Sequence, residues 1–267
     1  MKVTVIGVGN IGGAIARGLA KGSILKASDI TCTDLVQENL DKMLQANNSF
    51  IISKNNLEAV KNADIVIIAV KPWRVVSVIS EIKYALNYEN QIIISIAAGI
   101  SFDRLNEFLD KDPRPESTNT PAVFRVIPNT AIEVCSSMTF VSSCNATHEQ
   151  EELVVNLFNE LGSAMLIEEN LMTAGTALAS SGIAFAMRYI RASSEGGVEL
   201  GFYPDQAKEI VLKTVKGAVD LLLANKSNPE TEIDKVTTPG GITIRGLNEM
   251  ELAGFTPSVI RGLKASK

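Results

Sequence analysis

The sequence is poor in the side chains that most often carry protons or metals. Its 267 residues include one histidine, three cysteines and one tryptophan. His148 lies between Thr147 and Gln150, whose spacing is that of a helix capping box, so we expect it in the exposed first turn of a helix. The sequence therefore offers no histidine for an acid in ketone reduction, for a Ser-His-Asp triad or for a histidine-rich metal site.

The cysteines are Cys32, Cys135 and Cys144, an odd number with wide separations and no CxxC spacing. Neither a disulfide framework nor a zinc site is predicted, and no other metal site is expected. We expect the three thiols to be small buried hydrophobic groups.

Long apolar runs and basic patches are also missing. Twenty-five basic and thirty acidic residues give a net charge of −5, without a basic run, so nucleic acid is not an expected partner. The longest apolar runs, near residues 65–70 and 92–98, have the length of strands, which argues against a membrane span. The first strand starts at once and leaves no room for a signal peptide, which predicts a cytoplasmic location.

The most informative segment is the first. An apolar strand at residues 2–6 runs into Gly7, Gly9 and Gly12, a GxGxxG pattern, and then into an alanine-rich helical stretch. The first glycine permits the turn, the second lets a pyrophosphate approach the backbone, and the third lets the helix pack on the sheet. Glycines that serve only turns are the alternative, but the strand before and the helix after this pattern favour a dinucleotide site.

Asp34 ends a second predicted strand, residues 30–33, about twenty residues beyond the glycines, where the fingerprint places a ribose partner. The alternative is that Asp34 starts a solvated loop. A carboxylate accepts hydrogen bonds from both ribose hydroxyls of NAD and repels a 2′-phosphate, and no arginine stands beside it. We therefore expect NADH or NADPH, with NADH favoured by Asp34.

The alternation of short strands and helices predicts an α/β fold with a Rossmann-type, doubly wound parallel sheet. Residues 111–121, rich in Pro, Ser, Thr and Asn, are predicted to be an exposed loop. The predicted strands are residues 2–6, 30–33, 65–70, 92–96, 123–127 and 138–141.

The second part of the chain has helical periodicity and no convincing strand, so we expect two domains, residues 1–163 and 164–267. A helix around residues 174–186 is apolar and rich in small residues, and so small a domain cannot bury it alone. This predicts an all-α dimerisation domain; an ordinary central helix of a monomer is the alternative. The predicted helices are residues 149–161, 171–200, 204–224 and 257–267.

Three loops follow predicted strands, where ligands bind in such sheets. Lys71 and Pro72 follow one strand, and Lys71 would place a cation near a nicotinamide. Small side chains at residues 95–99 would let a ligand lie flat, and residues 127–130 form the third loop. Each loop alone could be a plain turn or helix start, but together they favour a ligand site.

A fourth segment of interest lies in the helical half. Residues 237–241, TTPGG, cannot be helical, whereas residues 244–252 can, which places Thr243 near an N-cap. Free N–H groups at Gly241, Ile242 and Thr243 would form a nest for a carboxylate. Capping alone would explain the threonine but not two glycines after a proline.

These motifs, in this order, resemble those of the pyrroline-5-carboxylate reductase family over essentially the whole chain. The family reduces 1-pyrroline-5-carboxylate to L-proline with NAD(P)H, the last step of proline biosynthesis, and joins a Rossmann domain to a helical domain that forms homodimers and larger assemblies. The resemblance rests on GVGNIGGAIARGL at residues 7–19, AVKP at 69–72, SIAAG at 95–99, RVIPNT at 125–130, TALASSG at 176–182 and VTTPGGITIRGL at 236–247.

The resemblance implies two sets of contacts, with Thr243 and Lys71 as the candidate catalytic residues and Thr243 reaching the ring nitrogen. The implied substrate contacts are Glu168, Thr238, Gly241, Ile242 and Thr243. The implied cofactor contacts are Gly7, Val8, Gly9, Asn10, Ile11, Gly12, Asp34, Asn56, Ala69, Val70, Lys71, Pro72, Ser95, Ile96 and Ala97.

The chain departs from the family pattern in three places, which concern the shape of the substrate pocket. Residues 179–185 read ASSGIAF where the family usually has SGSGPAY, Ile127 replaces a methionine, and Lys235 stands where some members have an uncharged polar residue. Two other functions stay open. A β-hydroxyacid dehydrogenase, which often relies on a lysine, ranks second because Lys71 lies in the first domain and Lys213 has no distinctive motif. A non-catalytic nucleotide-sensing dimer ranks third.

Overall fold

The computed structural model describes residues 1–111 and 120–267. The chain divides into two compact units, Met1–Ser180 and Ser181–Lys267, which are described separately below. The predicted loop at residues 111–121 lies mostly outside the described residues, apart from its ends.

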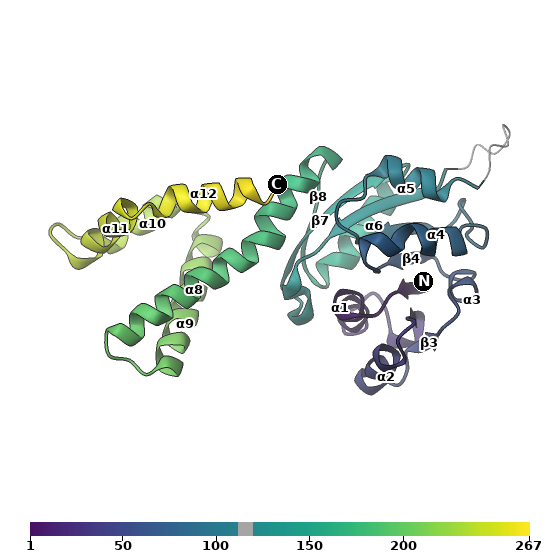
Figure 1. The fold of residues 1–267 in the computed structure, drawn as a ribbon, viewed down its shortest axis with the longest axis horizontal. Helices are drawn as coiled ribbons and strands as arrows, with labels where there is room; N and C mark the ends of the chain where they lie inside the picture. Colours follow the sequence, from purple (N-terminus) through teal and green to yellow (C-terminus); the bar gives the residue numbers. More distant parts are fainter. Residues whose placement is uncertain (112–119) are drawn as a thin grey trace. The chain divides into compact units, whose positions relative to one another are not determined.

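The first unit is built on an eight-stranded sheet of order β3-β2-β1-β4-β5-β6-β7-β8 (Figure 1). Strands β1 to β6 pair in parallel, β7 is antiparallel to β6, and β8 is parallel to β7. The doubly wound order of the first six strands confirms the predicted Rossmann-type fold, with an antiparallel extension at one edge. The strands are β1 (Val3–Ile6), β2 (Ile30–Thr33), β3 (Ile51–Ser53), β4 (Ile65–Ile68), β5 (Ile92–Ser95), β6 (Ala122–Ile127), β7 (Ser137–Cys144) and β8 (Gly162–Leu166).

The two edge strands, β3 and β8, are absent from the predicted set, and the prediction that no strand follows the helix near Thr147 is wrong. The central strand β4 is buried throughout, whereas β3 and β8 contain exposed or half-buried side chains. Backbone pairing with β7 positions β8. Its first residue, Gly162, has φ +139°, and a Cβ there would lie 2.2 Å from the Ser137 carbonyl oxygen, so the position requires glycine. Edge strands therefore lack the apolar run that identifies central ones.

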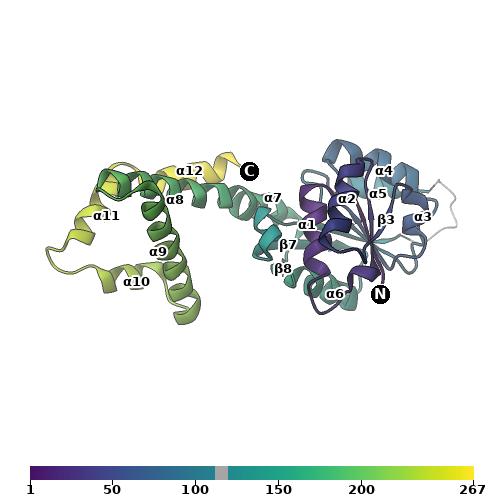
Figure 2. The same cartoon turned by 90° about the horizontal axis from the view of Figure 1, so that it is seen from below.

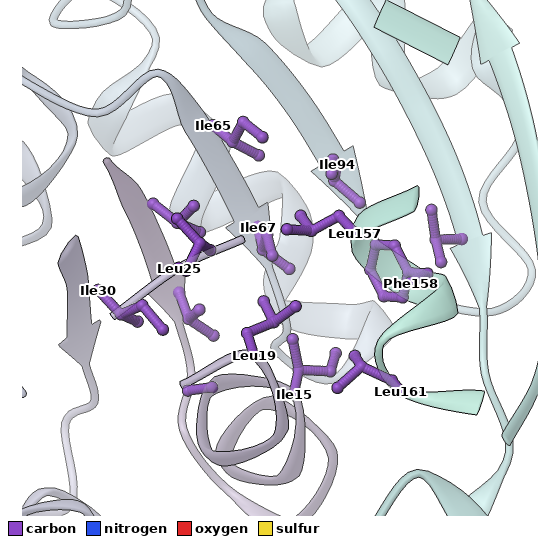
Figure 3. Close-up of a cluster of buried hydrophobic side chains, with 14 of the residues drawn as sticks. Ile15, Leu19, Leu25, Ile30, Ile65, Ile67, Ile94, Leu157, Phe158 and Leu161 are labelled. Carbon is purple, nitrogen blue, oxygen red and sulfur yellow. The ribbon is translucent and has the colours of Figure 1, made fainter. Parts of the chain in front are cut away.

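Helices cover both faces of this sheet (Figure 1). The apolar cluster on one face joins strands to α1, α2 and α6, and the cluster on the other joins them to α3, α4 and α5. Figure 3 shows Ile15 and Leu19 of α1 beside Leu157 and Phe158 of the helix α6, over Ile67 of β4. The helices are α1 (Asn10–Leu19), α2 (Gln37–Ala46), α3 (Asn56–Val60), α4 (Val75–Ile82), α5 (Phe102–Leu109) and α6 (His148–Asn159).

The first turn of α6 has the predicted capping box. Thr147 accepts from the Gln150 N–H, and the Gln150 side chain accepts from the Thr147 N–H. His148 is exposed, as predicted, with 78% of its side chain accessible. Of the cysteines, only Cys32 is fully buried, and burial raises the pKa of its thiol to about 12; Cys135 and Cys144 are half-buried.

The second unit is entirely helical (Figure 2). Helices α8 and α9 form a hairpin in which a Cβ at Gly197 would lie 2.9 Å from Cβ of Ala207, so the two backbones approach closely. Ahead of α8, residues of the first unit form α7 (Met172–Gly175) and a π-helical turn, Thr176–Ser181, which ends at the first residue of the second unit. The helices are α8 (Gly182–Glu199), α9 (Pro204–Asn225), α10 (Pro229–Val236), α11 (Ile242–Leu252) and α12 (Phe255–Ala265).

The second unit lacks a core of its own. Within residues 181–267, all of which the structure describes, Ala207 is the one buried hydrophobic residue. Leu200 and Leu252 are more than four-fifths exposed, and α8 buries no residue within the single chain. So much exposed apolar surface requires a covering partner, in agreement with the predicted dimerisation domain. Over the described parts of the chain, no helix is both long and apolar enough to cross a bilayer.

Candidate functional site

The turn from β1 into α1 has the geometry of a nucleotide-binding loop. Gly7 adopts φ +91°, which favours glycine. A Cβ at Gly12 would lie 2.1 Å from the Gly7 carbonyl oxygen and 2.8 Å from Cβ of Ala69, whereas a Cβ at Gly9 would meet nothing within 4 Å. Gly7 and Gly12 therefore serve close packing, and Gly9 faces space that a ligand can fill.

The N-terminus of α1 leaves its backbone donors available. Gly9 is the N-cap, no side chain caps the helix, and its first turn contains no acidic residue. The first N–H groups of a helix have no partner within it, so Asn10, Ile11 and Gly12 present donors and partial positive charge. The neighbouring Val8 N–H donates to the Thr33 carbonyl oxygen at 3.3 Å. This end of α1 therefore suits a pyrophosphate.

Asp34 lies half-buried just after β2, and its carboxylate already has partners. One oxygen accepts from the Val36 N–H at 2.9 Å and the other from Asn39 Nδ2 at 3.0 Å. These bonds fix the side chain and leave lone pairs on both oxygens for ribose hydroxyls. Asp34 is thus a preoriented acceptor at the end of β2.

Asn56, the first residue of α3, is buried beside the same strand end. Its Oδ1 accepts from the Thr33 hydroxyl at 2.6 Å, and its Nδ2 donates to Glu81 of α4 at 3.1 Å. The sequence prediction included Asn56 and missed Glu81, because a helical glutamate with no motif around it carries no signal.

The ends of β4 and β5 adjoin the glycine loop. The Ala69 N–H donates to the Ile6 carbonyl at 2.8 Å, which keeps residue 69 against Gly7 and Gly12. Lys71 is exposed and precedes a 3-10 turn, Pro72–Arg74. The structure therefore brings together the predicted cofactor residues of three strand ends, which are Gly7, Val8, Gly9, Asn10, Ile11, Gly12, Ala69, Val70, Lys71, Pro72, Ser95, Ile96 and Ala97.

A partly buried ion pair supports the loop after β5, and sequence reasoning missed it. Arg125 of β6, whose side chain is 11% exposed, pairs with Glu169 at 2.6 Å. The same Glu169 oxygen accepts from the Phe102 N–H at 2.7 Å, at the start of α5. The backbone of Arg125 lies in register with Ser95 at the end of β5. The Arg125–Glu169 ion pair therefore links the end of β5 to the segment after β8. An arginine inside the apolar run AVFRVI is the signal that could have identified it.

Glu168 stands apart from the glycine loop in the first unit. It is exposed, precedes the 3-10 turn Glu169–Leu171, and lines a cavity of about 670 Å³ with Phe102 and Ser142. Its predicted role in substrate binding stays a prediction.

The predicted carboxylate nest lies in the second unit at the start of α11. The helix begins at Ile242 with Gly241 as N-cap and no capping side chain, two residues earlier than predicted. The expectation of a free N–H at Gly241 is wrong, because this group donates to the Thr238 carbonyl at 2.9 Å. Ile242 and Thr243, both exposed, supply the first helical N–H groups and the threonine hydroxyl.

Two family models match different parts of the chain. Residues 169–267 match the family model for pyrroline-5-carboxylate reductase dimerisation, and residues 2–99 match the model for coenzyme F420-dependent NADP oxidoreductases. A pyrroline-5-carboxylate reductase of Aquifex aeolicus is 36% identical, over 97% of this chain and 92% of that protein. The chain belongs to the pyrroline-5-carboxylate reductase family.

Other relatives extend this comparison. Pyrroline-5-carboxylate reductase 2 of Dictyostelium discoideum is 37% identical over 99% of the chain and 90% of that protein, whereas the chain spans 48% of the longer reductase 1 of that organism, at 38% identity. The crystal structure of Plasmodium falciparum pyrroline carboxylate reductase with NADP bound superimposes with a TM-score of 0.86, at 27% identity over 100% of this chain and 95% of that one.

Family membership makes the chain an oxidoreductase that reduces pyrroline-5-carboxylate with a nicotinamide dinucleotide and assembles as an oligomer through its helical domain. A Mycobacterium tuberculosis 3-hydroxyisobutyrate dehydrogenase has a TM-score of 0.53 at 12% identity, over 76% of this chain and 66% of that one. That likeness shows a shared fold alone.

Alanine substitutions at Gly12 and Gly9 distinguish a glycine required for packing from one that leaves space for a ligand. We expect Gly12→Ala to lower the free energy of unfolding by about 1–3 kcal/mol, because its methyl group would press on the Gly7 carbonyl. Gly9→Ala should leave stability within about 1 kcal/mol of wild type and weaken NADH binding, because its methyl group would enter the space for the pyrophosphate. Urea unfolding and NADH titration measure the two effects; equal stability of both variants would contradict this assignment.

Proposed function

We propose that the chain reduces 1-pyrroline-5-carboxylate to L-proline with two anion-holding helix ends, one for the dinucleotide and one for the substrate carboxylate. The observation that carries the proposal is that α1 and α11 both begin at a glycine N-cap without a capping side chain. Helices α3, α5, α6 and α10 are instead capped by Asn55, Ser101, Thr147 and Asn228, whereas α12 shares the uncapped glycine, at Gly254. Uncapped amides are suited to bind anions.

The dinucleotide would be held by the residues around the glycine loop and by Asp34. A bound reduced nicotinamide supplies the hydride. Gly9 leaves space for its pyrophosphate, the first amides of α1 face the phosphates, and Lys71 adds a positive charge at the end of β4. Asp34 favours NADH over NADPH because a carboxylate repels a 2′-phosphate.

The substrate requires positioning more than acid catalysis. The nitrogen of a cyclic imine is basic, and its protonation in the pocket makes the neighbouring ring carbon electrophilic. The amides of Ile242 and Thr243 would bind the carboxylate, with Thr238 beside them, and the Thr243 hydroxyl would reach the ring nitrogen. Holding the ring in one orientation is then the main contribution of these residues. Glu168 completes the predicted substrate contacts.

Two further statements belong to this proposal. The functional assembly is a homodimer or a larger assembly of dimers, supported by the exposed apolar surface of residues 181–267. The cytoplasmic location stays a prediction.

One assay distinguishes the proposed reaction from the alternatives. NADH oxidation is followed with pyrroline-5-carboxylate, and NAD⁺ reduction is followed in parallel with a 3-hydroxyacid. We expect turnover with the imine alone. Turnover with the hydroxyacid alone would indicate a β-hydroxyacid dehydrogenase, and binding of NADH without either turnover would indicate a nucleotide sensor.

Thr243→Ala tests the substrate end. We expect kcat/KM for pyrroline-5-carboxylate to fall about tenfold, because one hydrogen bond to a charged ring is lost, while the dissociation constant of NADH stays unchanged. Thr214→Ala in α9 is the control, since that hydroxyl bonds within its own helix to Ile210 O. Unchanged kinetics in T243A would refute the role of this hydroxyl.

Asp34→Ala tests the coenzyme end. Removal of the carboxylate should narrow the preference for NADH over NADPH by about fivefold, since a 2′-phosphate no longer meets a like charge. Asn39→Ala removes a partner of Asp34 but not its charge, and should leave the coenzyme ratio near that of wild type. The measurement is kcat/KM for each coenzyme; an unchanged ratio in D34A would overturn this role of Asp34.

A further inference from the structure

A polar network with two buried members lies at the carboxyl end of β2. Thr33 is 1% exposed and Asn56 is 9% exposed, whereas Glu81 lies at the surface. The Thr33 hydroxyl donates to Asn56 Oδ1 at 2.6 Å, and Asn56 Nδ2 donates to Glu81 Oε2 at 3.1 Å. The network therefore joins a strand, the first residue of α3 and the last turn of α4.

Glu81 decides which way the Asn56 amide points. The Thr33 hydroxyl can donate or accept, so it would satisfy either orientation of the amide. A carboxylate only accepts, so it requires the NH₂ group of Asn56 on its side. Of the two partners of Asn56, Thr33 and Glu81, only Glu81 is restricted to one orientation of the Asn56 amide.

The fixed amide lies where the adenosine ribose is expected. Thr33 is directly followed by Asp34, the ribose acceptor of the proposed function, and ribose binds at the carboxyl end of this strand in Rossmann folds. After its bonds to Thr33 and Glu81, Asn56 retains one N–H and one lone pair for a ligand. An amide held in one orientation presents these in a fixed arrangement, which lowers the cost of ordering on binding.

We propose that Glu81 is a positioning residue for the dinucleotide, acting through Asn56. It sets the donor and acceptor pattern that Asn56 offers at the ribose end of the site. This inference rests on the proposed function for the place of the ribose, but it concerns cofactor binding alone and not the reduction of the imine.

A double-mutant cycle with Glu81→Ala and Asn56→Ala tests this role by calorimetric titration of the full-length protein with NADH. We expect each single substitution to weaken NADH binding about tenfold, and the double variant to bind no more weakly than N56A. E81Q should weaken NADH binding by less than E81A does, because a glutamine side chain can still accept from Asn56 but, unlike a carboxylate, can also donate to it. At saturating NADH, kcat with pyrroline-5-carboxylate should stay at the wild-type value in E81A.

Glu38→Ala in α2 is the control, because Glu38 is an exposed helical glutamate that pairs with Lys42 at 2.7 Å. The NADH affinity of E38A should equal that of wild type. Wild-type affinity in E81A or in E81Q, or additive losses in the double variant, would each overturn the proposal. Should E81A fail to fold, E81Q still tests the proposal, because it must weaken NADH binding in the wild-type background and have no effect in the N56A background. Failure of the imine assay with an intact cycle would count against the proposed reaction and not against Glu81.

Discussion

The contact between α1 and the Gly7 carbonyl is the constraint on which the nucleotide site depends. No side chain fits at Gly12, so the helix begins directly against β1 and beside Ala69 of the next strand. Because of this close packing, the first amides of α1 lie at the carboxyl ends of β1, β2, β4 and β5. Asp34, Asn56 and Lys71 follow or adjoin those strands, so the packing of one helix assembles the cofactor residues.

The helical unit depends on a different constraint, which is that it cannot bury its own apolar side chains. Its hairpin of α8 and α9 brings backbones close at Gly197 and Ala207 but leaves large side chains such as Leu223 exposed. The family match over residues 169–267 to a dimerisation domain explains this surface. The predicted carboxylate nest at α11 therefore belongs to a unit whose apolar surface requires a covering partner.

The sequence was sufficient for the elements that local patterns specify. Central strands were predictable because residues such as Ile67 and Ile94 are buried on both faces, and α6 because Thr147 and Gln150 form a local box. Edge strands and long-range contacts were not. β8 depends on pairing with β7, and the Gly241 N–H is taken by a turn that sequence spacing does not show.

The same distinction holds at the site. The glycines and Asp34 follow a fingerprint with fixed spacing. In contrast, Glu81 contacts Asn56 across 25 residues of sequence, and Arg125 contacts Glu169 across 44, so only the fold brings these side chains together. Contacts of this kind require the strand order before they can be inferred. Glu81 bonds to Asn56, and the backbone of Arg125 lies in register with Ser95, so both contacts adjoin predicted cofactor residues.

The most direct test of the account is the fate of the transferred hydrogen. NADH deuterated at both C4 positions is incubated with the protein and pyrroline-5-carboxylate, and the proline is analysed by mass spectrometry and NMR. The account predicts one deuterium per proline, on the carbon beside the ring nitrogen that was the imine carbon. Proline without deuterium, or NADH that stays reduced while bound, would contradict it.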